Sequence, residues 1–144
     1  MNAEQPLNQQ GQKSYSGTIK NFSKERYISS DWSTQEWKAV WTKSWIAAVH
    51  VSDLREPGDY AVFDLGPESV LLTCNAQGNV QAFYNVCQHR GVRLVTDHTG
   101  NTENFRCPYH SWRYDTDGDL IYAPHQDGFQ EGLPTQTPCL PAVR

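Results

Sequence analysis

Four residues of this chain could bind metal: Cys87 and His89, then, after a gap of seventeen residues, Cys107 and His110. Each half of this pattern supplies one thiolate and one imidazole, whereas zinc fingers commonly group their two cysteines in one half. Two cysteines and two histidines suit a binuclear iron–sulfur centre in which one iron takes both thiolates and the other takes both imidazoles. The pattern therefore predicts a protein that moves single electrons.

The residues around the two pairs favour the same chemistry. They read CQHRGVRL from Cys87 and CPYHSWRY from Cys107. Over roughly residues 31–144 the chain resembles the Rieske domain in the N-terminal part of the α subunits of ring-hydroxylating oxygenases. The resemblance implies that Cys87, His89, Cys107 and His110 bind a [2Fe–2S] Rieske cluster.

The same resemblance implies a fold. It is mainly β, a Rieske-type antiparallel β-sandwich or barrel with cluster-binding loops, preceded by an N-terminal helix. In that family a further strand closes the domain at about the place where this sequence stops, at Arg144. We therefore expect the final strand to be missing, and the chain to be a piece without a catalytic domain.

Six neighbours of the four residues are expected to surround the cluster. A glycine at position 91 would allow a positive φ or a close approach of the backbone. A proline at position 108 would fix the turn between Cys107 and His110. The phenol of Tyr114 is expected to bond a cysteine sulfur. The full set is Arg90, Gly91, Pro108, Tyr109, Trp112 and Tyr114.

The loops also predict a low reduction potential. Rieske proteins of quinol-oxidising complexes carry an extra cysteine in each loop, where this chain has Val92 and Tyr109. They also carry a serine that donates to a cluster sulfide, where this chain has Trp112. Fewer donors to sulfur leave the reduced state less stabilised. We expect a potential of about −150 to −100 mV, at the low end of the Rieske range.

The resemblance implies an electron route and its partners. A ferredoxin or flavin reductase would supply single electrons, and the cluster would pass them to a mononuclear Fe(II) in a catalytic domain, that of a neighbouring subunit. That iron needs two histidines and a carboxylate, which His50, His98 and His125 do not offer at short spacing. We therefore expect the chain to be part of an oxidoreductase that does not catalyse oxygenation by itself. A stand-alone Rieske-type ferredoxin and a structural zinc module remain alternatives.

Composition narrows the partners further. A net charge of −4 over 144 residues argues against nucleic acid. No apolar run approaches the length of a membrane span, and no secretory signal is visible, so we expect a cytoplasmic protein.

Of the two other cysteines, Cys74 reads as a buried apolar residue and Cys139 as a free thiol. Arginines near the two loops are either solvated charges or a basic collar that attracts an acidic donor: Arg90, Arg93, Arg106 and Arg113.

We expect three regions along the chain: a flexible arm over residues 1–28, a helical region over 29–45 and the Rieske domain over 46–144. Ser33 and Glu36 have the spacing of a capping box, which predicts that the helix begins at Ser33. Short apolar runs separated by turn residues predict antiparallel strands. These lie at residues 46–51, 60–65, 70–73 and 80–85, around Phe105 and Tyr114, and at Ile121 and Tyr122.

Overall fold

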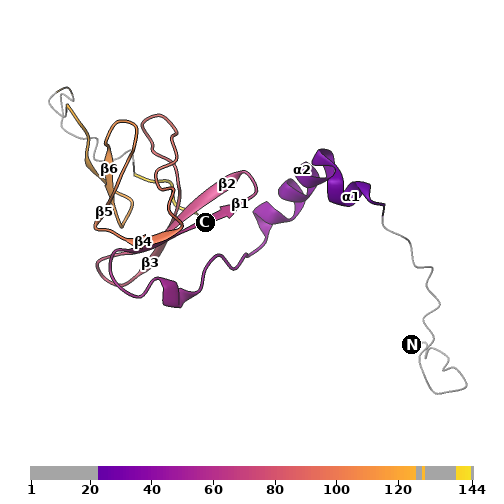
Figure 1. Ribbon diagram of the computed structural model, residues 1–144, viewed down its shortest axis with the longest axis horizontal. Coiled ribbons are helices and arrows are strands. Elements are labelled where there is room, and N and C mark those ends of the chain that lie inside the picture. Colours follow the sequence, from indigo (N-terminus) through magenta and orange to yellow (C-terminus); the bar gives the residue numbers. More distant parts are fainter. Residues whose placement is uncertain (1–22, 126–127, 129–138, 144) are drawn as a thin grey trace, which may run out of the picture. The chain divides into compact units, whose positions relative to one another are not determined.

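The computed structural model describes residues 23–125, 128 and 139–143. The chain divides into two units, Met1–Ser44 and Trp45–Arg144. The described part of the first unit is helical, and the second is built from two antiparallel sheets (Figure 1). Most of the arm expected over residues 1–28 lies outside the described residues, and its last part contains the short helix α1, Glu25–Ile28.

The main helix begins earlier than the capping box predicts. Helix α2 spans Ser30–Ala39, and its N-cap is Ser29, whose side chain accepts a hydrogen bond from the Trp32 amide. The prediction of Ser33 as N-cap is therefore wrong. Ser29 has the extended backbone that a cap requires, whereas the amide of Ser33 already bonds the Ser29 carbonyl as a helical residue.

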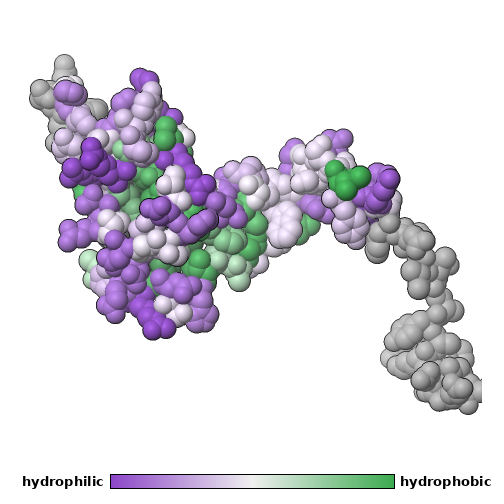
Figure 2. All heavy atoms as spheres, in the orientation of Figure 1, coloured by the Kyte–Doolittle hydropathy of each residue, from purple (hydrophilic) through white to green (hydrophobic). Residues whose placement is uncertain are grey.

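The helical unit buries none of the residues of its helices. A 3₁₀ turn, η1, follows over Trp41–Lys43. Ile28 and Tyr27 are exposed, and the face of this unit seen in Figure 2 is mostly polar or neutral with a hydrophobic patch. The described helices of this unit therefore have no buried face.

The larger sheet has the strand order β3-β2-β1-β4. Three of its strands were predicted, because β-branched and apolar runs alternate with turn residues there. The fourth, β4, was not predicted: its Thr-Gly-Asn sequence is fully exposed and pairs with β1 through Ala61 and Asp59. The strands are β1 Asp59–Leu65, β2 Glu68–Cys74, β3 Val80–Tyr84 and β4 Thr99–Asn101.

The strand predicted at residues 46–51 is absent. A 3₁₀ turn, η2, spans Val51–Asp53 instead. The His50 ring accepts a hydrogen bond from the Ser52 amide, and its carbonyl accepts one from the Asp53 amide. These local bonds form a turn over residues 50–53, at the place where the predicted strand would end. Val49 still becomes half-buried, against Leu54 and the β-sheet residues Ala61 and Cys74.

The smaller sheet carries the second pair of metal-binding candidates. Its order is β5-β6-β7, with β5 at Asn104–Arg106, β6 at Arg113–Asp115 and β7 at Leu120–Tyr122, as the sequence predicted. Cys107 and His110 lie in the loop that joins β5 to β6. The mainly β, antiparallel fold class is confirmed.

The core lies where side chains of both sheets meet. Leu71 and Phe83 come from the larger sheet, and Phe105 and Tyr114 from the smaller one. The Tyr60 and Phe105 rings pack edge to face with centroids 5.5 Å apart. Both Cys87 and Cys107 belong to this core, so the loops that carry them are anchored in the interior.

The C-terminal described residues run beside β3. The Pro141 carbonyl accepts from the Tyr84 amide at 2.8 Å, and the Val143 amide donates to the Ala82 carbonyl at 2.9 Å. Ala142 forms a β-bridge with Phe83. The chain thus pairs with β3 just before the point at which we expected the closing strand to begin.

Candidate metal centre

The two loops that carry the metal-binding candidates share one backbone design. In the first, the Gly91 amide donates to the Cys87 carbonyl, and the Cys87 amide donates to the Val92 carbonyl. In the second, Ser111 and Trp112 make the equivalent bonds to Cys107. Gly91 has φ of 67° and Ser111 has φ of 60°. Each loop therefore turns on a left-handed residue four positions after its cysteine.

The second of these left-handed residues is not a glycine. A non-glycine residue at positive φ costs roughly 1–2 kcal/mol, and Ser111 remains there with its hydroxyl accepting from Arg106 at 2.8 Å. Gly91 fulfils the expectation of a positive φ. Ser111 was not identified from the sequence, although its position relative to Cys107 matches that of Gly91 relative to Cys87.

Both thiols are buried, with Cys87 1% and Cys107 2% exposed. Burial raises the pKa of the Cys87 thiol and the adjacent Cys107 raises it further, whereas hydrogen bonds from Tyr114 and the His89 backbone lower it. A buried thiol of raised pKa ionises when a metal ion supplies positive charge beside it. The two sulfurs thus lie together in a place where metal binding would convert them to thiolates.

Tyr114 joins the two loops. Its hydroxyl lies 3.5 Å from the Cys87 sulfur and accepts a hydrogen bond from the Gln88 amide at 3.1 Å. Because the Gln88 amide occupies one lone pair of the Tyr114 oxygen, the phenol proton is free to point at the Cys87 sulfur. Burial and the contact with Cys87 raise the pKa of Tyr114, so the phenol keeps its proton at neutral pH. The expected bond from Tyr114 to a cysteine sulfur is present.

His89 and His110 lie next to each other, with ring centroids 4.7 Å apart. The Nδ1 atoms of both rings are buried and have no hydrogen-bond partner. Burial lowers the pKa of His89, and the charges of His110 and Arg90 lower it further, which favours the neutral ring. A neutral imidazole with a free ring nitrogen is the form that binds a metal.

Aromatic side chains flank both imidazoles. The Trp112 ring stacks on His89 at 4.8 Å and 11°, and Tyr109 covers His110 with centroids 3.8 Å apart. Trp112 is half-buried and packs against the core, whereas Tyr109 is 57% exposed. The stacked rings restrict how far the two imidazoles can rotate.

An open hollow of about 510 Å³ lies over the two imidazoles. One of the residues that line this hollow, His125, has a left-handed backbone with φ of 58°. Both imidazoles therefore line a surface that another molecule can reach. The lining residues are His89, His110, Ser111, Trp112, Pro124, His125 and Gly128.

The donor set fits a [2Fe–2S] cluster with mixed ligands. A buried polar atom without a partner costs about 1–3 kcal/mol, and an iron ligated by both Nδ1 atoms would remove that cost for His89 and His110. Across the described part of the chain, no three His, Cys, Asp or Glu side chains gather as a single metal ion would require. Two thiols and two imidazoles are the donor set of a mixed-ligand [2Fe–2S] cluster.

The other residues singled out from the sequence lie apart from the four donors or only border them. Arg90 and Pro108 are exposed within the loops. Cys74 is buried against Leu54 and Ala61, and Cys139 is an exposed free thiol, so no disulfide joins them. His50 caps η2, and His125 borders the hollow. In the described residues, no helix is long and apolar enough to cross a membrane.

Two antiparallel sheets that present two buried thiols and two imidazoles on neighbouring loops define an iron–sulfur domain with mixed ligands. Residues 44–141 match the Rieske [2Fe-2S] domain family. The chain therefore belongs to the Rieske [2Fe–2S] domain family, whose cofactor is the Rieske cluster.

The curated relatives are oxygenase subunits. The chain is 35% identical over 100 residues to the chlorobenzene dioxygenase subunit alpha of Cupriavidus sp. (strain PS12), which covers 69% of this chain and 22% of the relative. It is 36% identical over 91 residues to the large oxygenase component of the naphthalene 1,2-dioxygenase system of Ralstonia sp., covering 63% of this chain and 20% of that protein. The match thus spans about a fifth of these relatives.

Solved structures show the same fold. The naphthalene 1,2-dioxygenase from Rhodococcus sp. bound to indole has a TM-score of 0.73 and 28% identity, covering 78% of this chain and 26% of that one. A quaternary ammonium Rieske monooxygenase has a TM-score of 0.76 and 31% identity, covering 85% and 33%. The chain is a Rieske domain homologous to the N-terminal domain of oxygenase α subunits. The mononuclear iron of those subunits belongs to their catalytic domain.

Proposed function

We propose that this chain carries single electrons within an aromatic-ring-hydroxylating oxygenase α subunit, and that Cys87, Cys107, His89 and His110 bind the cluster. One observation supports the ligand assignment above all: two adjacent imidazoles have buried Nδ1 atoms without a hydrogen-bond partner, on the same two loops that carry two buried thiols. When bound, the [2Fe–2S] cluster accepts and releases one electron at a time.

The residues of this chain then have separate roles. The thiols of Cys87 and Cys107 hold one iron and the imidazoles hold the other. Tyr114 donates to the Cys87 sulfur, which favours the more negative, reduced state. Trp112 and Tyr109 keep the imidazoles in place and limit water at their faces. Residues 46–144 would form the electron-carrying domain, with residues 29–45 as a helical segment and 1–28 as an arm before it.

The hollow over His89 and His110 supports a proposal for the electron exit. Both imidazoles line an accessible surface, so a mononuclear Fe(II) site in a catalytic domain, that of a neighbouring subunit, could receive the electron there. A ferredoxin or flavin reductase would be the donor. Arg90, Arg106 and Arg113 are exposed on or beside the loops, and their charge suits an acidic donor whose association slows as salt rises.

The ligand assignment is tested on the purified chain after anaerobic reconstitution. The wild type should be coloured and, once reduced with dithionite, should give the rhombic EPR signal of a mixed-ligand cluster. Cys87→Ser and His110→Ala should lose that signal, whereas Cys74→Ser, at a buried cysteine outside the loops, should keep it. An unchanged signal in either ligand variant would show that the assignment is wrong.

The reduction potential distinguishes this class of Rieske domain from the quinol-oxidising class. Trp112 stacks on an imidazole and has no hydroxyl to offer a sulfide, and no cysteine stands at position 92 or 109. We expect a midpoint of about −150 to −100 mV by redox titration followed by EPR. A midpoint above zero would contradict the proposal.

A further inference from the structure

The two metal-binding loops differ in how their ends are joined. The second loop closes on a regular ladder, in which Phe105 pairs with Tyr114 and Arg106 with Arg113. The first loop closes on one isolated bridge, between Val86 and Arg93. A backbone ladder fixes the separation of two strands, and a single bridge leaves more freedom. Across this bridge the Cys87 amide donates to the Val92 carbonyl at 2.8 Å, and the Leu94 amide donates to the Asn85 carbonyl at a long 3.4 Å. Side-chain bonds add to this short backbone pairing.

The side chain of Asn85 joins the two ends of the first loop. Its Oδ1 accepts from the Val95 amide at 2.9 Å, and its Nδ2 donates to the Val95 carbonyl at 2.7 Å. Two residues of antiparallel strands exchange the same pair of bonds through their backbones. The backbone amide of Asn85 is not available for this, because it donates to the Ser69 carbonyl of β2 at 2.8 Å. The side-chain amide therefore replaces a missing rung of the ladder.

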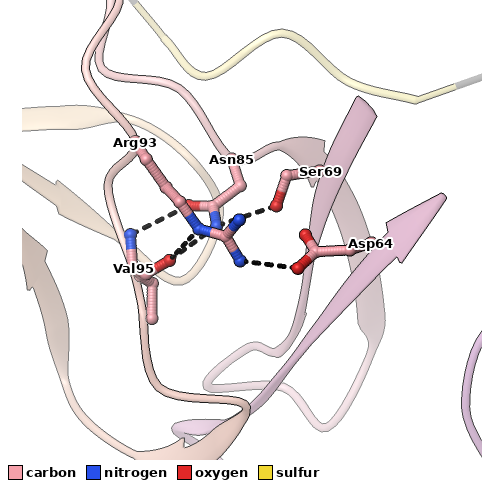
Figure 3. A network of polar contacts seen from close by, with 5 residues as sticks. All are labelled: Asp64, Ser69, Asn85, Arg93 and Val95. Atoms are coloured by element: carbon pink, nitrogen blue, oxygen red, sulfur yellow. Dashed lines mark hydrogen bonds and ion pairs between the residues drawn. The ribbon is translucent and has the colours of Figure 1, made fainter. Parts of the chain in front are cut away.

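Further contacts support this rung, and Figure 3 marks those that join Asn85 to Ser69 and Val95 and those that join Arg93 to Val95 and Asp64. Asn85 Nδ2 also donates to Ser69 Oγ at 3.2 Å, and the Ser69 side chain lowers the pKa of the Asp64 carboxyl. Asp64 pairs with Arg93 at 3.0 Å, and Arg93 Nε donates to the Val95 carbonyl at 3.0 Å. We name these five residues the Asn85 ring. It ties both ends of the first loop to β1 and β2.

The members of the Asn85 ring differ in burial. Asn85 is 3% exposed, so its three side-chain bonds form away from water, where a lost partner costs most. Arg93 and Asp64 have side chains 38% and 45% exposed, and an ion pair that accessible contributes little by itself. The hydrogen bonds from Ser69 and Arg93 lower the pKa of Asp64, which keeps its carboxylate ionised to accept both. Asn85 is thus the centre of the ring.

We infer that Asn85 is a positioning residue for the metal centre: by clamping Val95, it sets where the first loop presents Cys87 and His89 relative to the second loop. The inference rests on the proposed function, because only a shared cluster requires the two loops to be in register. Residues that orient metal ligands from outside typically change metal affinity by about 10–100-fold when they are replaced. Asn85 begins the first loop two residues before Cys87, and Val95 ends it.

The chain offers a matched control in Asn75. That side chain is 4% exposed and also makes three bonds: it accepts from the Gln77 and Asn79 amides and donates to Asp117. None of these partners belongs to the two metal-binding loops. Asn85→Ala and Asn75→Ala should therefore lower the unfolding temperature similarly, while only Asn85→Ala should act on the cluster.

The experiment uses the full chain with reconstituted cluster. The rate of cluster loss to an iron chelator and the EPR g-values are recorded for the wild type, Asn85→Ala, Asn85→Asp and Asn75→Ala. We expect Asn85→Ala to lose its cluster about tenfold faster than wild type and to shift the g-values. Asn85→Asp, which keeps the acceptor but loses the amide donors, should fall between, and Asn75→Ala should match wild type. Equal loss rates and g-values in the two alanine variants would overturn the inference.

Two further measurements distinguish a failure of this inference from a folding defect and from a failure of the proposed function. Should Asn85→Ala not fold, Ser69→Ala opens the ring at a half-buried hydroxyl and should shift the g-values in the same direction; unchanged values would count against the ring. In the metal-free wild type, the Val95 amide should exchange with solvent slowly, and in Asn85→Ala rapidly. If the wild type binds no cluster, the proposed function fails, whereas rapid exchange at Val95 in the wild type would refute the clamp itself.

Discussion

At the scale of single residues, the Tyr114 hydroxyl contacts the first loop both as a hydrogen-bond acceptor and as a donor. The hydroxyl accepts from the Gln88 amide and lies 3.5 Å from the Cys87 sulfur. It comes from β6, which follows the second loop, so one buried side chain links the two halves of the donor set. Its effect on the cluster is electrostatic, because a donor to sulfur stabilises the extra negative charge of the reduced state.

Tyr114→Phe should therefore lower the reduction potential. The loss of one hydrogen bond of about 1 kcal/mol corresponds to about 40 mV for a one-electron couple. The unfolding temperature should also fall, since the Gln88 amide loses its partner. Redox titration of reconstituted wild type and variant measures the shift, with Tyr122→Phe, outside both loops, as control. A potential equal to that of the wild type would refute the bond to sulfur.

At the scale of elements, two hairpin loops are near copies of each other. In the loop after β2, Asn75 accepts from the amides of residues 77 and 79, and in the loop after β6, Asp115 accepts from those of residues 117 and 119. The loops also bond each other, through Asn75 to Asp117 and through the Thr73 hydroxyl to the Thr116 carbonyl. They connect the two sheets at a place outside the metal-binding loops.

Asp115→Asn should stabilise the domain at neutral pH. Burial raises the pKa of Asp115, and the charges of Asp119 and Asp117 add to this although backbone donors oppose it. A folded pKa above the unfolded value means that the contribution to stability is present at acidic pH and is lost as the pH rises through the folded pKa. Asparagine avoids that loss and keeps the acceptor, as Asn75 does.

The expected gain from Asp115→Asn is about 0.5 kcal/mol at pH 7, the range of a partly exposed loop position. Urea unfolding at several pH values measures it, and the difference from wild type should disappear in acid. The reciprocal change, Asn75→Asp, places a carboxylate beside Asp117 and should destabilise the domain at pH 7. A pH-independent difference for Asp115→Asn would show that ionisation is not the cause.

Two glycines of these loops provide a second comparison. Gly78 has φ of 78° and Gly118 has φ of 84°. A Cβ at Gly78 would meet nothing within 4 Å, whereas a Cβ at Gly118 would lie 2.6 Å from the Phe83 ring. Gly118 must therefore be glycine for two reasons, its backbone conformation and its contact with β3, and Gly78 for the first reason alone.

Gly78→Ala should cost about 1 kcal/mol from the left-handed backbone. Gly118→Ala should cost the same plus about 1–3 kcal/mol for overpacking against Phe83. Thermal and urea unfolding of the two variants measure the difference. Equal destabilisation would mean that the loop after β6 does not pack on β3 as closely as the structure shows.

At the scale of the whole domain, the metal centre and the hydrophobic core are continuous. Cys87 and Cys107 are core residues beside Leu71, Phe83 and Phe105. The sheets meet there, and the two imidazoles lie at the outer edge of the same region. Metal binding and folding should therefore be coupled.

Removal of the cluster should lower the free energy of unfolding. Two buried imidazole nitrogens without partners cost about 2–6 kcal/mol together. Comparison of holo- and apo-protein by calorimetry, with circular dichroism for strand content, measures the effect. The larger sheet contains none of the four donors, so we expect the apo-protein to keep part of its strand signal. Equal unfolding temperatures would contradict the coupling.

Much of the candidate site could be predicted from the sequence, because its residues lie at short spacings along the chain. Cys87, His89, Cys107 and His110 were identified from residue type and spacing, and Gly91 and Tyr114 from their places beside them. The strands of the larger sheet were predicted where apolar runs alternate with turn residues, and β4 was missed because an exposed Thr-Gly-Asn run has no such pattern. The start of α2 was wrong because Ser29 and Ser33 offer the same hydroxyl, and only the backbone of Ser29 is extended.

The features that could not be predicted from the sequence depend on contacts between residues distant in the chain. The sequence by itself determined which candidate donors are present and that antiparallel strands carry them, since both follow from residue type at short spacing. Only the tertiary structure decided that the two Nδ1 atoms are buried without partners, that Asn85 bonds Val95 through its side chain, and that Gly118 lies against Phe83. These features arise when the two sheets pack together, because packing alone determines which polar atoms lose water and which backbone segments come within reach of one another.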